Sequence, residues 1–491
     1  MAAFQSIASN KREKRVDLPL ILAYLFLIGA GWVNIYSAVY SEEHTFIFDF
    51  TQRYGMQFIW ICLSLLTAIV VLYIIKPSIY ATFSPFFYVV MLVLLFAVTF
   101  LGREVHGSKS WFFIGSFGIQ PAEFSKITTS LLLAAVMGQY GFSLSNKKDL
   151  LKAAMVVIIP IVLIIMERET GSALVYLGLI LVFYLMGMSG WVIIMGLSII
   201  AIFIMTILHT AGVAILYALG AAFILKLFID GSWRYFLSAL PLFVLCAFIP
   251  KLEVLEIGEY TPLGFLTCLK RELWTLLVFI PHLFIWAKEL LGIKLRGRTK
   301  RNSKWLLVSL ICAVIVTFGV NFMFNKVLQT HQKARIENLL GITEDLQGIG
   351  YNVHQSKIAI GSGGFAGKGF LNGTQTKYNF VPEQSTDFIF CTVGEEWGFI
   401  GSMLVLIVYI FLIIRIILLA SKNEEPFVKI YGWCVASIFA MHVFINMGMT
   451  MGIVPVIGIP LPFLSYGGSS MLSFTLLLFI FIRLDMSRQK R

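Results

Sequence analysis

The chain has 491 residues, of which 58% are hydrophobic and 13% charged, and its mean hydropathy is +0.87. A soluble domain carries roughly 25% charged residues, so this composition excludes a soluble globular protein and indicates an integral membrane protein. The net charge of +12 would favour nucleic acid as the partner of a soluble chain, but here the basic residues cluster in short loops and tails, as the positive-inside rule expects. We expect no nucleic-acid partner.

Fourteen apolar stretches are candidate transmembrane helices, because a helix that crosses the bilayer needs about 20 predominantly apolar residues. They lie at about 18–40, 57–75, 80–101, 120–140, 152–166, 172–187, 189–208, 212–229, 234–250, 273–291, 305–325, 388–418, 427–450 and 467–484. The stretches at 152–166 and 234–250 are short enough to be re-entrant instead. The sequence therefore predicts an all-α polytopic membrane protein with about fourteen spans.

Charged residues lie at the start of the fourth span, in QPAEFSK (120–126). Glu123 and Lys126 are three residues apart, so on a helix they share one face and can form an ion pair. Such a pair could simply help the helix to enter the membrane. Ionisable residues within spans are costly, however, and usually face a cavity or a partner, which leaves a functional role equally open. A second polar patch, ERETGSA (167–173), connects the fifth and sixth spans.

The segment 326–387 is much longer than the other connections. Long loops are usually functional or disordered, and its aromatic residues and glycines favour an ordered, functional loop. The stretch GSGGFA (361–366) formally matches a dinucleotide-binding fingerprint, but no strand or βαβ unit is expected around it. Two interpretations of these glycines are left: a flexible hinge between two short amphipathic helices, or a backbone cradle for a phosphate next to Lys368.

Two carboxylates, Glu383 and Asp387, end this loop in FVPEQSTDFIF (380–390), directly before the next span. A carboxylate in this place is either a helix N-cap, which bonds the free N–H groups of the first turn, or a general base. Ser385 and Thr386 could cap the helix equally well, which favours a catalytic role for Asp387. Farther on, 448–470 is apolar but rich in Gly and Pro, so it cannot be a regular lipid-facing helix and should be a buried re-entrant loop.

The distribution of basic residues predicts the orientation of the spans. If NKREKR before the first span is cytoplasmic, fourteen spans also place Lys147, Lys148, Lys152, the basic block 294–304 and the C-terminal tail inside. Both termini are then cytoplasmic. The loops on the outer side are 41–56, 102–119, 251–272 and 326–387.

The cysteines and histidines do not indicate a metal site. The six cysteines lie almost entirely in apolar stretches, without metal-ligand pairs or a disulfide framework, and we interpret them as packing residues. The seven histidines are scattered and form no cluster with Cys or carboxylates at the usual ligand spacings. We expect no structural metal.

Five motifs in the same order resemble the SEDS family, the shape, elongation, division and sporulation proteins. They are QPAEFSK, QSKIAIGSGGFAGKG, NGTQ, PEQSTDFIF with GEEWGFIG, and GIVPVIGIPLPFLSYGGSS. The details NGTQ and PEQSTDF are closer to the RodA branch than to the FtsW branch. The resemblance covers roughly 1–188 and 304–491. It implies a ten-span helical bundle with a large extracytoplasmic loop at 326–387, and it leaves 189–303 as an insertion of four further spans.

This resemblance implies a peptidoglycan glycosyltransferase that polymerises lipid II at the outer face of the bacterial cytoplasmic membrane, together with a class B penicillin-binding protein and other proteins of the elongation complex. The family's catalytic carboxylate falls on Asp387. Its tryptophan and lysine after the third span fall on Trp111 and Lys109, and its Gln-Pro-x-Glu-x-x-Lys motif includes Glu123 and Lys126. The family's Gln-Pro-Asp-Leu-Gly-Thr is replaced here by ERETGS, which makes the role of Glu169 less secure.

The chemistry of glycan polymerisation fits these residues. A sugar hydroxyl attacks an anomeric carbon that carries a lipid diphosphate, which requires a base and positive charge on the departing oxygens. We expect Asp387 to be the base. Lys109, Lys126 and Lys368, or a divalent cation such as Mg²⁺ or Mn²⁺, are the candidates for the positive charge.

With one carboxylate singled out, an inverting transfer is favoured. A retaining enzyme needs a second carboxylate as nucleophile, which Glu383 or Glu395 could provide only if the fold brings it close. The alternatives to an enzyme are a transporter that flips lipid II and a non-catalytic scaffold of the cell-wall synthesis complex. In each case membrane lipid surrounds the protein.

Overall fold

The computed structural model describes residues 16–487, with gaps at 42–43, 45, 106–107, 116, 209–210, 292–296 and 379 and with only isolated residues described within 232–270 and 328–349. The chain forms two compact units, one made of Met1–Ser189 with Leu346–Arg491 and one of Gly190–Asp345. Each unit is described by itself.

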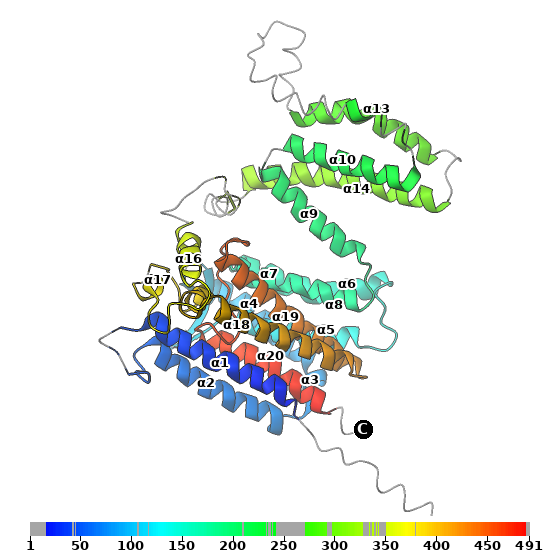
Figure 1. Ribbon diagram of the computed structural model, residues 1–491. Helices are drawn as coiled ribbons and strands as arrows, with labels where there is room; N and C mark the ends of the chain where they lie inside the picture. Colours follow the sequence, from blue (N-terminus) through cyan, green and yellow to red (C-terminus); the bar gives the residue numbers. More distant parts are fainter. Residues whose placement is uncertain are drawn as a thin grey trace, which may run out of the picture. The chain divides into compact units, whose positions relative to one another are not determined.

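The first unit is a helical bundle (Figure 1). Its N-terminal helices are α1 (Leu18–Val39), α2 (Arg53–Ile69) with the π-helical turn η1 (Val70–Ile74), α3 (Pro77–Thr82), α4 (Ser84–Leu101), α5 (Pro121–Met137), α6 (Lys147–Met166), α7 (Thr170–Val175), the 3₁₀ turn η2 (Tyr176–Leu179) and α8 (Ile180–Leu185). Its C-terminal helices are α16 (Tyr351–Ser362), α17 (Thr374–Lys377), α18 (Ile389–Ser421), α19 (Pro426–Thr450) and α20 (Gly468–Ser487).

Local sequence explains where several of these helices begin. Proline stands in the first turn of α3, α4, α5 and α19, where its missing N–H would have no partner in any case. Asp17 caps α1 by accepting a hydrogen bond from the amide of Leu20 at 3.1 Å. The same carboxylate binds Arg415 of α18 at 2.7 Å, so the cap also joins the first helix to a C-terminal one.

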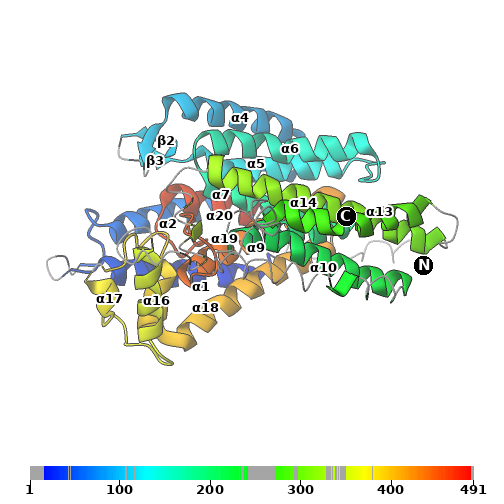
Figure 2. The same cartoon turned by 90° about the horizontal axis from the view of Figure 1, so that it is seen from above.

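A small antiparallel sheet interrupts the helical pattern between α4 and α5. It consists of β1 (Arg103–Val105), β2 (Ser108–Ile114) and β3 (Phe117–Ile119) in the order β1-β2-β3, with Phe112 opposite Ile119. The molecule is mostly helical as predicted, and the sheet lies within 102–119, which the sequence predicts to be an outer loop. In both views of the ribbon this sheet lies at the same end of the unit as α16 and α17 (Figures 1 and 2).

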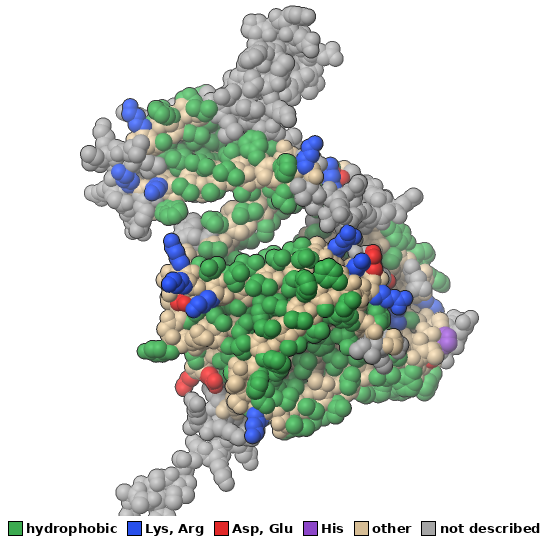
Figure 3. Space-filling view, turned by 180° about the vertical axis from the view of Figure 1, so that it is seen from behind, with side chains coloured by type: hydrophobic (Ala, Val, Ile, Leu, Met, Phe, Trp, Pro, Cys, Tyr) green, Lys and Arg blue, Asp and Glu red, His purple; other side chains and the backbone are tan. Residues whose placement is uncertain are grey.

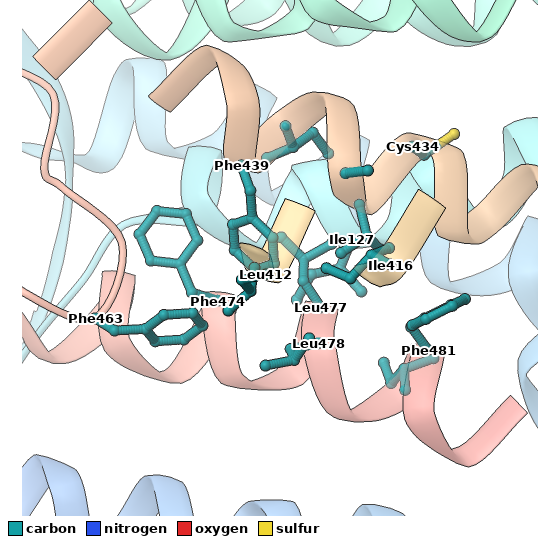
Figure 4. Close-up of a cluster of buried hydrophobic side chains, with 14 of the residues drawn as sticks. Ile127, Leu412, Ile416, Cys434, Phe439, Phe463, Phe474, Leu477, Leu478 and Phe481 are labelled. Atoms are coloured by element: carbon teal, nitrogen blue, oxygen red, sulfur yellow. The ribbon is translucent and has the colours of Figure 1, made fainter. Parts of the chain in front are cut away.

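The core of the first unit is formed by the C-terminal helices packed on α1 and α5. Phe474 of α20 lies with its ring centroid 5.9 Å from that of Phe439 of α19 and 6.0 Å from that of Phe463, which belongs to the segment between these helices. Figure 4 shows these rings together with Ile127 of α5 and Leu412 of α18. Segments far apart in the sequence therefore share one apolar centre.

The glycine-rich stretch 361–366 packs against the main chain of α18. A Cβ atom at Gly363 would lie 2.0 Å from the carbonyl oxygen of Gly394, so only glycine allows this approach. At Gly398, whose φ is 63°, the regular helix is broken, and the next two amides donate to the carbonyls of Gly364 and Phe365. These glycines therefore allow two backbones to touch.

The segment 451–467 between α19 and α20 is irregular, as its Gly and Pro content predicted. Much of it is buried: Ile459 and Leu461 are each 1% exposed and Leu464 is fully buried.

The second unit contains α9 (Trp191–Leu208), α10 (Ala211–Asp230), α13 (Arg271–Leu291), α14 (Gly297–Phe322) and the π-helical turn η3 (Met323–Val327) among its described residues. It has a core of its own, in which the ring centroids of Phe223 and Trp286 lie 6.0 Å apart. Lys226 is buried there and binds Glu289 at 2.9 Å. Most of the predicted span 234–250 lies outside the described residues.

Eight helices of the described residues are long and apolar enough to cross a membrane, and three shorter apolar helices accompany them. The predicted stretch 152–166 belongs to one of the eight, α6. Hydrophobic side chains cover a broad face of the first unit, with Lys and Arg side chains toward its margins (Figure 3). The chain is therefore a multi-pass membrane protein, whereas the count of fourteen spans stays a prediction.

Candidate functional site

The loop 383–387 ends directly before α18, where Asp387 is half-buried. The N-cap position of α18 is occupied by Phe388, and no side chain caps the helix there. Asp387 therefore lies one residue before the N-cap position that one of its two interpretations gave it. Its carboxylate borders the segment before α20, because a Cβ atom at Gly458 would lie 3.2 Å from Asp387 Oδ2.

Three consecutive carbonyls of this loop are held by the C-terminal part of the chain. The carbonyl of Ser385 accepts from the amide of Tyr466 at 2.9 Å. The carbonyl of Thr386 accepts from Ser465 Oγ at 2.6 Å, and that of Asp387 accepts from Asn446 Nδ2 at 2.8 Å. The main chain at the candidate base is thus fixed by both α19 and the segment 451–467.

Arg53, the first residue of α2, binds the same loop. Its guanidinium donates to Ser385 Oγ at 2.8 Å, lies 3.5 Å from Glu383 Oε2, and stands over the ring of Tyr466 at 5.9 Å. Its side chain is 47% exposed, so part of the guanidinium faces outward. Sequence analysis missed this residue, although a cation at the end of the predicted outer loop 41–56 was a usable signal.

The small sheet carries two of the predicted substrate-binding residues. Lys109 and Trp111 are alternate residues of β2, so they share one face of the sheet. Lys109 is exposed and Trp111 half-buried. Ser469 of α20 joins the end of this sheet to α20, because its hydroxyl donates to the carbonyl of Gly118 at 2.8 Å and accepts from the amide of Gln120 at 3.2 Å.

Glu123 and Lys126 form the ion pair that their spacing predicted, at 2.8 Å. Both side chains are buried, and Lys126 Nζ also lies 2.8 Å from His442 Nε2 and 5.2 Å from the ring centroid of Phe474. Ser473 of α20 donates to the second oxygen of Glu123 at 3.2 Å. The pair is engaged by side chains of α19 and α20, and its contact with a substrate stays a prediction.

Two carboxylates meet between α6 and α7. Burial raises the pKa of Glu167 to about 9, and the nearby Glu169 adds to this effect. Burial also raises the pKa of Glu169, against the hydrogen bonds that Ser172 and Gln120 give it. The carbonyl of Glu167 accepts from the amide of Lys109 at 3.2 Å, which ties this turn to β2.

Lys368 and Glu395 form a second ion pair, at 2.7 Å, in which Glu395 is fully buried. Glu395 also accepts from the amides of Gln375 and Thr376 at 2.9 and 3.0 Å. A carboxylate with this many donors is committed to holding the loop after α16 on α18. The described contacts give both residues a structural role, and the predicted contact of Lys368 and Glu395 with a substrate stays a prediction.

The described residues do not form a site that would hold a metal ion by itself, since no three of their His, Cys, Asp and Glu side chains gather suitably. A divalent cation as a source of positive charge at the diphosphate stays a prediction.

Comparison with known proteins places these motifs in a family. The model of the family described as cell cycle protein, which covers FtsW, RodA and SpoVE, matches residues 18–223 and 302–490. The peptidoglycan glycosyltransferase RodA of Treponema pallidum is 30% identical over 93% of this chain and 94% of its own length. The peptidoglycan glycosyltransferase MrdB of Escherichia coli is 29% identical over 83% and 79%.

A solved structure has the same fold. This structure is described as the structural coordination of polymerization and crosslinking by a peptidoglycan synthase complex. It matches with a TM-score of 0.59 and 19% sequence identity, and the match covers 97% of this chain and 99% of that chain. The family match breaks at 223 and resumes at 302, and the compact units divide at 190 and 345. These two sets of limits differ from each other. The bounds 189–303 of the insertion therefore stay a prediction. With most of its length matched, this chain belongs to the SEDS family of cell cycle proteins that includes FtsW, RodA and SpoVE.

Proposed function

We propose that this protein is a peptidoglycan glycosyltransferase that polymerises lipid II during cell elongation, at the outer face of the bacterial cytoplasmic membrane. The names of two relatives that match most of their length support the reaction. The observation that carries the assignment of the site is Asp387: a half-buried carboxylate one residue before the N-cap of α18, in a loop whose carbonyls are held one after another. A carboxylate fixed in this way is suited to act as a general base.

In the proposed step a sugar hydroxyl attacks the anomeric carbon of a second lipid-linked sugar. The new C–O bond forms as the hydroxyl proton passes to Asp387, and the bond from the anomeric carbon to the diphosphate breaks, with the electron pair leaving on the lipid diphosphate. Positive charge near the departing oxygens stabilises this transition state. Lys109 and Arg53 are the best candidates for that charge, because Lys126 and Lys368 are each paired with a buried glutamate.

The geometry favours inversion at the anomeric carbon. Retention requires a second carboxylate as nucleophile, about 5 Å from the first. Glu395 is fully buried and bonded to a lysine and two amides, and Glu383 accepts from Thr386 Oγ1 at 3.2 Å and faces Arg53. Because protein donors already engage both carboxylates, we favour inversion.

The proposal includes an orientation and partners. The loop 326–387 lies outside, both termini are cytoplasmic, and a class B penicillin-binding protein with other elongation proteins works alongside the enzyme. Orientation is tested with single cysteines at the exposed positions Ser145 and Thr51, in a background without the other cysteines. A membrane-impermeant thiol reagent added to intact cells should modify the Thr51→Cys variant alone, and equal labelling of both would overturn the orientation.

The function is tested with purified protein, alone and with its cognate penicillin-binding protein, on labelled lipid II. We expect glycan chains from the wild type and none from Asp387→Asn, since asparagine keeps the shape but cannot take the proton. Near-normal turnover by Asp387→Asn would reject the base assignment. An inactive wild type that moves lipid II across vesicles would favour a transporter, and one that does neither would favour a scaffold.

A further inference from the structure

Two polar side chains of α19, His442 and Asn446, are fully buried and take no chemical part in the proposed transfer. They are four residues apart, so they lie on one face of the helix. The side-chain amide of Asn446 donates to the carbonyl of Ile459 at 2.6 Å and to the carbonyl of Asp387 at 2.8 Å. A single amide group therefore joins the segment before α20 to the residue proposed as the base.

His442 binds the next residue of the same segment, Pro460. Its Nδ1 lies 3.1 Å from the carbonyl oxygen of Pro460, and its Nε2 lies 2.8 Å from Lys126 Nζ. A carbonyl can only accept, so Nδ1 carries the hydrogen and Nε2 of the neutral ring accepts from the ammonium. The carbonyls of Ile459 and Pro460 are thus held by successive turns of α19, and the His442 ring rests on the ion pair of α5.

Buried backbone without regular secondary structure needs such donors. Residues 451–467 lack a helical hydrogen-bond ladder, and a membrane protein must satisfy the freed groups from within. Asn446 and His442 satisfy two of them from a long helix. The same amide of Asn446 then sets the position of the Asp387 main chain, so the rigidity of α19 is transmitted to the loop at the site.

We propose that Asn446 positions Asp387 for catalysis and that His442 supports the segment behind it. The inference rests on the proposed function, with Asp387 as base. A displacement of about 1 Å at a reacting group costs on the order of 10²-fold in rate. Because Asn446 reaches Asp387 through its main-chain carbonyl and is itself buried, its loss lowers the turnover number and leaves the half-saturating concentration of lipid II unchanged.

The test is Asn446→Asp, which keeps the size of the side chain but removes both donor hydrogens and sets an oxygen against two carbonyls. We expect turnover to fall about 10²-fold at an unchanged half-saturating concentration. Amide hydrogen exchange in the peptide 381–390 should become faster. The matched control is Thr450→Val on the same helix, whose buried hydroxyl donates within α19 to the carbonyl of Met447 at 2.8 Å; both readouts should stay at wild-type values.

Asn446→Asp with wild-type turnover, or with wild-type exchange in 381–390, would overturn the proposal, as would an equal loss in Thr450→Val. If Asn446→Asp does not purify as a single species, Ser465→Ala replaces it, because this variant releases the neighbouring carbonyl of Thr386. Turnover should again fall and amide exchange in 381–390 should again become faster. Wild-type values of both would overturn the proposal. The exchange measurement needs no lipid II, so failure of the positioning role is distinguishable from failure of the proposed activity.

Discussion

The ammonium of Lys126 lies 2.8 Å from the carboxylate of Glu123, and both side chains are buried within the bundle. Removing one partner of such a pair leaves an uncompensated buried charge, which costs about 3–5 kcal/mol, whereas replacing both is much less costly. We therefore expect Lys126→Met to lower the free energy of unfolding by about that amount. The double variant Glu123→Gln/Lys126→Met should recover most of it, as measured by thermal unfolding in detergent.

The matched control for this pair is the more exposed one between Lys333 and Glu337, 3.7 Å apart. Exposed pairs contribute about 0–1 kcal/mol, so Lys333→Met should have little effect on unfolding. A double variant of Glu123 and Lys126 that is as unstable as the single one would contradict the interpretation that the two charges mainly stabilise each other.

Contacts between residues close in the sequence could be predicted, whereas contacts between distant residues could not. The pairing of Glu123 with Lys126 was predictable because it depends on helical spacing alone. The irregular conformation of 451–467 was equally predictable from Gly and Pro. The contact of Arg53 with Ser385 was not, because these residues are 332 positions apart and no local pattern encodes which loop meets which helix.

The small sheet and the α19 donors illustrate the same limit. Two of the strands, β1 and β3, have three residues each, too few for an alternating pattern to be recognised. His442 and Asn446 lie in an apolar span, where a buried polar residue can be identified in the sequence but its partners cannot. Their carbonyl partners become visible only when the irregular segment is folded back on α19.

The carboxylate of Glu395 is expected to be structural. It accepts from Lys368 Nζ at 2.7 Å and from the amides of Gln375 and Thr376. In Glu395→Gln one oxygen becomes an NH₂ group that opposes these donors, so the variant should lose about 3 kcal/mol of stability, the scale of a broken buried pair. Limited proteolysis should cut the loop 363–378 faster, while Glu424→Gln, at an exposed position, should digest at the wild-type rate. Unchanged digestion of Glu395→Gln would contradict this role.

Stability should depend on pH through Glu167. Its pKa is raised from 4.5 to about 9 in the folded protein, so between these values the folded state holds a proton that the unfolded state releases. The contribution is therefore fully present below pH 4.5 and is lost as the pH rises toward 9. The slope is at most about 1.4 kcal/mol per pH unit.

Glu167→Gln removes this titration. The melting temperature of the variant should exceed that of the wild type by an amount that grows between pH 5 and pH 8, a window of about three units inside the shifted range. Glu104→Gln in β1, at an exposed position, is the control and should follow the wild-type curve. A difference between Glu167→Gln and wild type that stays constant over this range would show that the carboxyl of Glu167 titrates normally.

Arg53 provides a test of how the departing diphosphate is held. Its pair with Glu383 is partly exposed at 3.5 Å, and such pairs contribute about 0–1 kcal/mol to stability, so substitution should leave folding intact. If the guanidinium binds diphosphate oxygens in the transition state, Arg53→Gln should lose on the order of 10²-fold in turnover, the scale measured for one electrostatic donor. Arg53→Lys should retain part of the activity, because a lysine keeps the charge but not the planar fork.

Lys148→Gln, an exposed position on the predicted cytoplasmic side, is the control for a general effect of lost charge. If both Arg53 variants polymerise lipid II at the wild-type rate, the charge on the leaving group must come from Lys109 or from elsewhere, and Arg53 only ties α2 to the loop before Asp387.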